Sequence, residues 1–158
     1  MLLITPSFIS YKGLIVSVLL NQIKSYLPPS VNTKLVNKSI CQVSKNKMMM
    51  TCFLGVVDKN TKIVHYVNAS HEAPFILSAR QDLKKKDLVF LDESKCNRLG
   101  QSSTSEFSVA QYQLSPGDRI FVYTDGVPDI RNKKEESLQE RGLFKVVIVK
   151  FFYNSFKQ

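Results

Sequence analysis

The chain has 158 residues, of which 44% are hydrophobic and 22% are charged, and this composition excludes an intrinsically disordered protein. The length is sufficient for one well-formed hydrophobic core, so we expect a single domain over residues 1–158. Twenty-two Lys and Arg against thirteen Asp and Glu give a formal net charge of +9, which favours an acidic partner: a phosphorylated protein, an acidic protein face, nucleic acid or anionic lipid.

The N-terminal segment, residues 1–23, carries a single charge at Lys12. A signal peptide has its positive charge before the apolar core and a small-residue cleavage site after it, and neither is present. Proline and polar residues also interrupt the run of about 18 apolar residues that a membrane span requires. Apolar residues at helical spacings instead predict an amphipathic helix over residues 12–26 and no membrane span.

A second helix is predicted to begin at Pro29 or Ser30, because both residue types suit a helix start. Its expected apolar face consists of Val31, Leu35, Val36, Ile40 and Val43. We expect both helices to cover one face of a sheet.

Strands are predicted over residues 50–58 and 62–69, joined by a turn at Asp58–Thr61, and over Phe75–Leu77. Residues 81–106 are mostly polar and predict a variable loop containing one short strand at Leu88–Leu91. The basic triplet at residues 84–86 in this loop has no stacking aromatics beside it, so we interpret it as solvated and expect no nucleic-acid partner.

Apolar and polar side chains alternate over Phe107–Leu114, and we expect this strand to pair with the strand that leads to Asp125. The chain should close with a helix rich in Lys and Glu over residues 132–150.

The three cysteines, Cys41, Cys52 and Cys96, are odd in number and have no C-x-x-C spacing. This pattern argues against a disulfide framework or a structural zinc site, and it makes a reducing cytoplasm the simplest location. Cys41 and Cys52 lie in apolar patterns and are expected to be buried small hydrophobes.

The most informative stretch is residues 114–132, which reads L-S-P-G-D-R-I-F-V-Y-T-D-G-V-P-D-I-R-N. A Pro-Gly turn precedes an apolar strand, and the strand delivers the carboxylate of Asp125 onto Gly126. Carboxylate oxygen is a hard donor suited to Mg²⁺ or Mn²⁺, and glycine allows the backbone to approach an ion. An ordinary turn has the same Asp-Gly signature.

This stretch resembles the L-x-P-G-D…Y-T-D-G block of the SpoIIE-type, PPM-class metal-dependent serine/threonine protein phosphatases. A second block, M-T-C-F-L-G-V-V-D at residues 50–58 followed by K-I-V-H-Y-V-N-A-S-H-E-A-P-F-I-L at residues 62–77, is similar to that family's paired strands. The resemblance runs from about Gly13 to about Lys145. It implies an α+β fold, the four-layer α-β-β-α sandwich of these phosphatases, here incomplete.

The resemblance also implies roles for individual residues. Asp125 and Gly126 correspond to the metal-binding T-D-G, whereas Asn68, His71, Asp129 and Asn132 are expected to support the site geometry rather than to perform chemistry. His65, inside a strand, is expected to be structural. Such phosphatases hold two Mn²⁺ or Mg²⁺ ions through Asp residues in three motifs, and the early G-D-x-x-G-H-G and late D-D-x-T motifs have no counterpart here. No catalytic residue is assigned, and only weak metal binding is expected.

The resemblance therefore implies a serine/threonine phosphatase of bacterial signalling whose substrate is a phosphorylated regulatory protein. This chain is expected to be a truncated or degenerate member with little or no activity. Whether it is an enzyme stays open. The alternative is a catalytically dead, phosphatase-like binding module for an acidic or phosphorylated signalling partner, and a weaker reading is an unrelated membrane-associated small protein. If strands have been lost from both ends, exposed sheet edges predict poor solubility or a homodimer.

Overall fold

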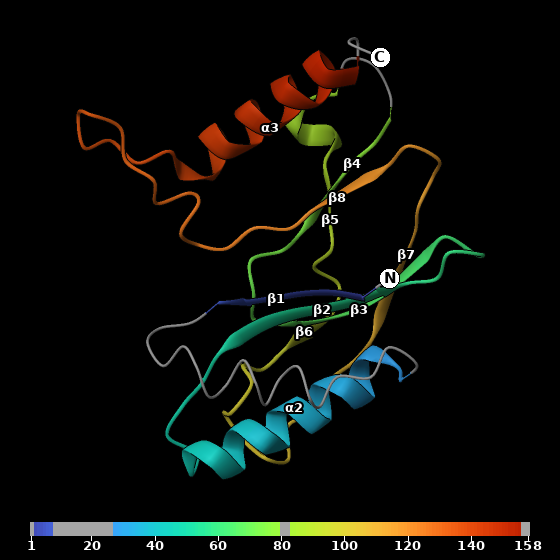
Figure 1. Ribbon diagram of the computed structural model, residues 1–158, viewed down its shortest axis with the longest axis vertical. Coiled ribbons are helices and arrows are strands. Elements are labelled where there is room, and N and C mark those ends of the chain that lie inside the picture. The colour runs from blue at the N-terminus through green and yellow to red at the C-terminus, as the bar shows by residue number, and fades with distance from the viewer. Residues whose placement is uncertain (1, 8–26, 80–82, 156–158) are drawn as a thin grey trace. The chain divides into compact units, whose positions relative to one another are not determined.

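The computed structural model describes residues 2–7, 27–79 and 83–155 (Figure 1). The helix predicted over residues 12–26 lies outside these described residues. The chain divides into two compact units, residues 1–73 with 91–114 (unit 1) and residues 74–90 with 115–158 (unit 2). The expectation of a single domain stays a prediction, and each unit is described by itself.

The strands in the described part of unit 1 form one five-stranded sheet. Strand β1 (Leu2–Ser7) pairs antiparallel with β2 (Thr51–Val57), which pairs antiparallel with β3 (Ile63–Ala69). Two further strands pair with β3, namely β6 (Lys95–Cys96) in parallel and β7 (Ala110–Gln113) antiparallel. The sequence analysis did not predict β1 or β6.

The predicted hairpin between β2 and β3 is confirmed. Its turn is closed by two backbone hydrogen bonds of 2.9 Å, from Asp58 N–H to Ile63 O and from Lys62 N–H to Asp58 O. The Asp58 carboxylate also accepts a 2.8 Å hydrogen bond from the Asn60 N–H. That bond is the main reason why the pKa of Asp58 lies below its ordinary value.

Helix α2 (Pro29–Ser44) covers the sheet of unit 1 and begins at Pro29, as predicted. Val36 and Ile40 are buried, but Val31 and Val43 are 39% and 50% exposed, so the expected apolar face was wrong at its two ends. The core of unit 1 comprises Val36, Ile40, Met50, Cys52, Leu54, Val67, Ala69, Leu99 and Phe107.

Asn37 takes one of the buried positions on α2 that the expected apolar face left out. Its side chain accepts a 2.8 Å hydrogen bond from the Gly100 N–H and donates one of 2.8 Å to the Ser102 carbonyl. Because both the oxygen and the nitrogen of the amide bond to these backbone groups, its burial is compensated, and it fastens a distant loop to the helix.

Unit 2 contains a three-stranded antiparallel sheet in the order β5 (Val89–Phe90), β4 (Phe75–Leu77), β8 (Arg119–Phe121). The short helix η1 (Lys85–Asp87) precedes β5, and helix α3 (Gln139–Ser155) follows β8. The strand predicted at Phe75–Leu77 is confirmed, and so is a short strand within residues 88–91. Lys84, Lys85 and Lys86 are exposed, as expected for a solvated segment.

Aromatic rings form the centre of the core of unit 2. The Phe75 ring lies 5.2 Å from that of Phe144 on α3 and 5.0 Å from that of Phe121 on β8, measured between centroids. Phe144 also contacts Phe90 edge to face at 5.6 Å. The two pairs of Phe144 attach α3 to β4 and β5, and the Phe75–Phe121 pair joins β4 to β8.

The predicted partner of the 107–114 strand was wrong. Strand β7 keeps the predicted alternation of half-buried and exposed residues, but it pairs with β3, whereas β8 pairs with β4. The intervening turn is held by the Asp118 carboxylate, which accepts hydrogen bonds from the N–H groups of Ser115 (2.9 Å) and Ala79 (3.4 Å). The bond from Ser115 closes the turn, and the bond from Ala79 connects it to the segment after β4, the strand with which β8 pairs.

The predicted start of the last helix was also wrong, because α3 begins at Gln139 and not at residue 132. Residues 131–137 form a closed turn in which Arg131 and Ser137 make an antiparallel bridge. Glu135 and Gln139 have φ angles of 63° and 54°. Left-handed backbone at Glu135 is incompatible with a helix that runs on from residue 132, and Gln139, the first residue of α3, marks the change from the turn to the helix.

Each unit thus joins a sheet to a helix on one of its faces, and the predicted α+β class is confirmed. No helix in the described part of the chain is long and apolar enough to cross a membrane.

Candidate functional site

Asp125 lies in an exposed turn that follows β8. The strand ends at Phe121, four residues before Asp125, and buried Tyr123 anchors the connection, with its hydroxyl 3.5 Å from a carboxylate oxygen of Glu140. The Asp125 carboxylate accepts a 2.9 Å hydrogen bond from the Gly126 N–H. Because this carboxylate is exposed and close to a buried aromatic anchor, it is presented to solvent from a structured turn.

Gly126 is not required by the backbone geometry of this turn. It has no positive φ, and a Cβ added to it would meet nothing nearer than the Thr124 hydroxyl at 3.8 Å. A role for Gly126 in the approach of an ion therefore remains a prediction.

Asp129 and Asn132 follow Asp125 in the same unit. Asp129 is exposed, whereas Asn132 organises the turn before α3. The Asn132 side chain accepts hydrogen bonds from the N–H groups of Lys134 (2.8 Å) and Glu136 (3.1 Å), and it donates one of 2.8 Å to the Glu136 carboxylate. Asn132 thereby shapes the segment between the Asp125 turn and the helix.

Asn68 and His71 lie at the end of β3 in unit 1 and are joined by reciprocal hydrogen bonds. The Asn68 amide accepts from the His71 N–H at 2.7 Å and donates to the His71 carbonyl at 3.0 Å. The His71 ring Nδ1 is 3.0 Å from the Glu72 carbonyl oxygen. Asn68 and His71 are both buried. His71 thus contacts backbone, as expected for a turn histidine, and His65 is half-buried within β3.

Ser70 connects these two residues and has a φ of 57°, in the left-handed region that favours glycine. Its hydroxyl donates a 2.9 Å hydrogen bond to the Cys96 carbonyl. The resembling family has glycine at this point of its motif, so the backbone conformation is consistent with the motif although the residue is not.

Burial argues against a nucleophilic role for Cys41 and Cys52. All three are free, and Cys41 and Cys52 are buried, as predicted. Burial raises the pKa of Cys52 to about 12, so its thiol is protonated at neutral pH.

The predicted site residues fall into two groups. Asp125, Gly126, Asp129 and Asn132 belong to unit 2, whereas Asn68 and His71 belong to unit 1. The residues that the structure describes contain no group of three or more His, Cys, Asp or Glu side chains that could hold a metal ion. Hard divalent ions need several oxygen ligands, so the described donor set does not fit a pair of ions.

Two residues that organise the backbone in these units were not singled out from the sequence: Asn37, which fastens the loop at Gly100, and Asp118, which connects the turn before β8 to Ala79 after β4. The only signal for Asp118 was its place in the S-P-G-D turn, where an aspartate side chain commonly bonds nearby N–H groups.

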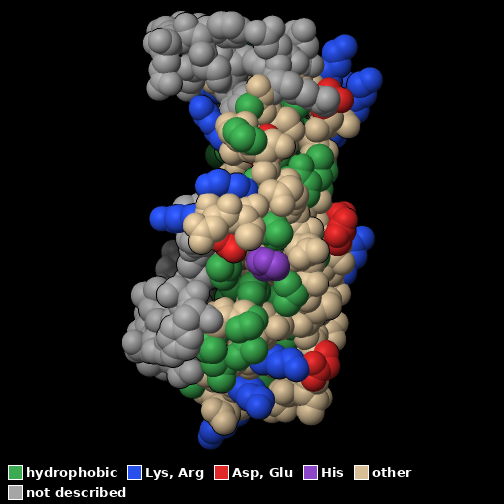
Figure 2. Space-filling model, turned by 90° about the vertical axis from the view of Figure 1, so that its right-hand side faces the viewer, with side chains coloured by type: hydrophobic (Ala, Val, Ile, Leu, Met, Phe, Trp, Pro, Cys, Tyr) green, Lys and Arg blue, Asp and Glu red, His purple; other side chains and the backbone are tan. Residues whose placement is uncertain are grey.

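On the face shown in Figure 2, Lys and Arg side chains lie in several separate places rather than in one patch.

Comparison with known proteins identifies first the fold and then the family. The structure is similar to the crystal structure of the RsbU and RsbW domains of Rv1364c from Mycobacterium tuberculosis, with a TM-score of 0.66, 21% identity, and coverage of 83% of this chain and 37% of that one. Residues 10–151 match the model of Stage II sporulation protein E (SpoIIE), and the chain belongs to this family. The predicted resemblance and fold class are thereby confirmed.

A curated relative, Protein IcfG from Synechocystis sp., is 30% identical over 104 residues. The match covers 66% of this chain but only 16% of IcfG, so this chain corresponds to a small part of that relative.

Proposed function

We propose that this chain acts in bacterial phosphoprotein signalling as a SpoIIE-type serine/threonine phosphatase domain, with a phosphorylated regulatory protein as its partner and with weak or no turnover of its own. The observation that carries the proposal is the T-D-G turn after β8, inside the region that matches the family, where the Asp125 carboxylate is exposed to solvent. The protein of the structural neighbour contains an RsbU and an RsbW domain, which supports a regulatory protein as the kind of partner. A cytoplasmic location is part of the proposal.

Membership of the family implies dependence on a divalent metal, and Mn²⁺ or Mg²⁺ suits carboxylate oxygen. Asp125, beside Gly126, is the ligand that the family motif assigns in this chain. Because no cluster of three ligand side chains occurs among the described residues, we attribute no reaction step to a bound metal and expect weak metal binding.

The test is to measure Mn²⁺-dependent phosphate release from a phosphoserine peptide by the purified chain, beside an Asp125→Asn variant, together with binding of the same peptide and its unphosphorylated form. We expect slow or no release and preferential binding of the phosphorylated peptide. Rapid release that disappears in Asp125→Asn would contradict weak turnover and would show a complete site around Asp125. Equal affinity for both peptides, without release, would contradict the phosphoprotein role.

The second candidate function is a binding module without any catalysis. The formal net charge of +9 favours it, because such a chain attracts acidic or phosphorylated partners whether or not it binds metal. The two candidates differ in their response to metal: binding that is unchanged by Mn²⁺ and by Asp125→Asn supports the module, whereas binding that needs both supports the phosphatase domain.

A further inference from the structure

Helix α3 has an outer face that combines cations with exposed apolar side chains. Leu143 and Phe144 are buried in the core of unit 2, and Phe144 packs on the sheet. Between residues 141 and 150, the exposed side chains, which we call the outer face of α3, are Arg141, Lys145, Val146, Val149 and Lys150. Val146 and Val149 are 48% and 66% exposed, although a helix that packs on one side normally has polar residues on the other.

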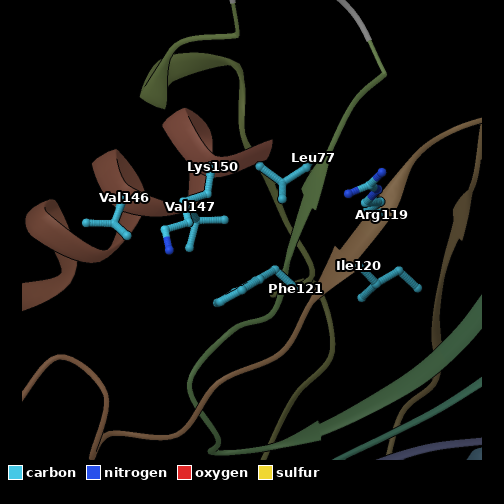
Figure 3. Close-up of a pocket in the computed structure, with 7 residues that line it drawn as sticks. All are labelled: Leu77, Arg119, Ile120, Phe121, Val146, Val147 and Lys150. Atoms are coloured by element: carbon cyan, nitrogen blue, oxygen red, sulfur yellow. The ribbon is translucent and has the colours of Figure 1, made fainter. Parts of the chain in front are cut away.

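The two exposed valines lie between the cations. With about 3.6 residues per turn, Lys145 falls on one side of the strip formed by Val146 and Val149, and Lys150 falls on the other. On the side of β8 the apolar surface continues into a groove of about 340 Å³, whose apolar lining consists of Leu77, Ile120, Phe121, Val146 and Val147 (Figure 3). The outer face is therefore an apolar strip flanked by positive charge.

The described residues do not neutralise the cations of the outer face. None of Arg141, Lys145 and Lys150 forms an ion pair with another residue that the structure describes. Glu140 is the only acidic residue in the sequence of α3, and its carboxylate lies 3.5 Å from the Tyr123 hydroxyl. The outer face therefore keeps its positive charge available for a ligand.

The short helix η1 adds positive charge beside α3. The two helices are in contact, and Lys85 Nζ lies 5.0 Å from the centroid of the Phe144 ring. Lys84, Lys85 and Lys86 are all exposed, whereas the carboxylate of Asp87 accepts a 2.9 Å hydrogen bond from the Lys84 N–H within η1. Three cations from η1 and three from α3 thus lie on two packed elements of the same unit.

An anionic bilayer complements this surface better than a protein does. Clusters of about four to eight Lys and Arg on an amphipathic helix are typical of binding to anionic lipids. Their long stems can follow the apolar surface while the charged groups reach lipid phosphates, and apolar side chains between them enter the boundary of headgroups and acyl chains. Protein interfaces are instead centred on aromatic or Arg anchors in pockets, and the exposed apolar residues of the outer face are valines.

We propose that the outer face of α3, together with η1, binds reversibly to the surface of an anionic bilayer. The six cations contact lipid phosphates, and Val146 and Val149 lie at the boundary of headgroups and acyl chains. The helix rests on the bilayer and does not cross it. This binding surface goes beyond the proposed function, because it uses neither the Asp125 turn nor a phosphoprotein.

The test measures co-sedimentation of the full chain with vesicles of pure phosphatidylcholine and with vesicles that also contain about 30% phosphatidylserine, an anionic lipid. We expect binding to the anionic vesicles to be at least about tenfold tighter. It should weaken as salt is raised, because salt screens exposed charges. Lys145→Glu and Val149→Asp should each weaken this binding at least about fivefold.

Matched controls separate the outer face from general charge and exposure. Lys38 and Val43 are exposed on α2 in unit 1, so Lys38→Glu and Val43→Asp make the same substitutions on another helix. Both variants should bind the anionic vesicles within about twofold of the unchanged chain. Circular dichroism of each variant verifies that it is folded.

A fluorescent probe locates the contact. The chain contains no Trp, so Val149→Trp introduces a single indole on the outer face, and Val43→Trp introduces one on α2. We expect the emission of Val149→Trp to move to shorter wavelength when anionic vesicles are added, because the ring enters a less polar environment. The emission of Val43→Trp should stay unchanged, and a shift in Val43→Trp alone would contradict the proposal.

The proposal is overturned if the anionic vesicles do not bind, if both kinds of vesicle bind equally, or if the control variants weaken binding as much as the outer-face variants. Binding of a soluble poly-glutamate peptide that Lys145→Glu abolishes, without vesicle binding, would assign the surface to an acidic protein. A dimer in sedimentation that Val149→Asp dissociates would assign it to a second copy, and either result overturns the proposal. Asp125→Asn should keep full vesicle binding, so failure of this surface and failure of the proposed function are distinguishable.

Discussion

At the scale of single residues, Asn68 is the side chain on which the conformation around His71 depends. Its amide satisfies both the N–H and the carbonyl of His71, and it is only 5% exposed. Truncation would leave two buried backbone groups without these partners, so we expect Asn68→Ala to lower the free energy of unfolding by about 2–3 kcal/mol.

Urea denaturation measures this loss, and Asn68→Asp gives a useful comparison. The carboxylate can still accept the bond from the His71 N–H but cannot donate to the carbonyl, and it places a charge in a buried position. A destabilisation of Asn68→Ala below about 0.5 kcal/mol, the range of ordinary surface substitutions, would show that the two bonds contribute little.

At the scale of elements, the β2–β3 hairpin contains an acid-sensitive turn. The Asn60 N–H holds the pKa of the Asp58 carboxyl below its ordinary value, so the ionised form stabilises the folded state. This contribution is present above the pKa of the unfolded carboxyl and is lost as the pH falls through the lower folded pKa.

We therefore expect the stability difference between the unchanged chain and Asp58→Asn to shrink as the pH is lowered below about 4, the ordinary range of an Asp carboxyl. Thermal unfolding of both proteins between pH 7 and pH 2.5 measures the difference. A difference that stays constant over this range would show that ionisation of Asp58 has no part in the turn.

The loop that Asn37 fastens to α2 requires glycine at residue 100. Gly100 has a φ of +81°, and an added Cβ would lie 2.1 Å from the Met48 carbonyl oxygen. We expect Gly100→Ala to lower the free energy of unfolding by at least about 2 kcal/mol, because the left-handed backbone and the overlap both oppose a side chain.

Gly126→Ala is the matched control, because its added Cβ meets nothing closer than 3.8 Å and its φ is not positive. It should change stability by less than about 0.5 kcal/mol. Guanidinium denaturation of the two variants compares them directly, and equal stability of both would contradict the steric interpretation of Gly100.

At the scale of the whole molecule, the described residues form two hydrophobic cores that share no residue. Phe144 joins α3 to the sheet of unit 2, and Phe53 is fully buried in unit 1, where it stacks on Tyr66 at 5.5 Å. Removing a buried Phe side chain costs about 3–5 kcal/mol. We therefore expect local unfolding, which exposes backbone amides to solvent, in the unit that has lost its packing.

We expect Phe144→Ala to increase amide hydrogen exchange in β4 and β8 while β2 and β3 keep their protection, and Phe53→Ala to do the reverse. Residue-resolved exchange measured by NMR tests both variants. Equal loss of protection in both units would show that the chain unfolds as a single cooperative body.

The local elements were predictable from the sequence where short-range patterns decide the structure. The start of α2 at Pro29, the hairpin at Asp58 and the strand at Phe75–Leu77 depend on turn residues and periodicity close to them in the chain. The family was recognisable from the blocks at residues 50–77 and 114–132, and within them from the T-D-G containing Asp125.

The tertiary structure alone decided which strands pair and which polar side chains are buried. Alternation in residues 107–114 predicted a strand but not its partner β3, because the period of two is the same for every antiparallel neighbour. Asn37 is buried because its amide meets backbone groups more than sixty residues away, at Gly100 and Ser102. Contacts between segments so distant in sequence leave no local pattern, so only the fold reveals them.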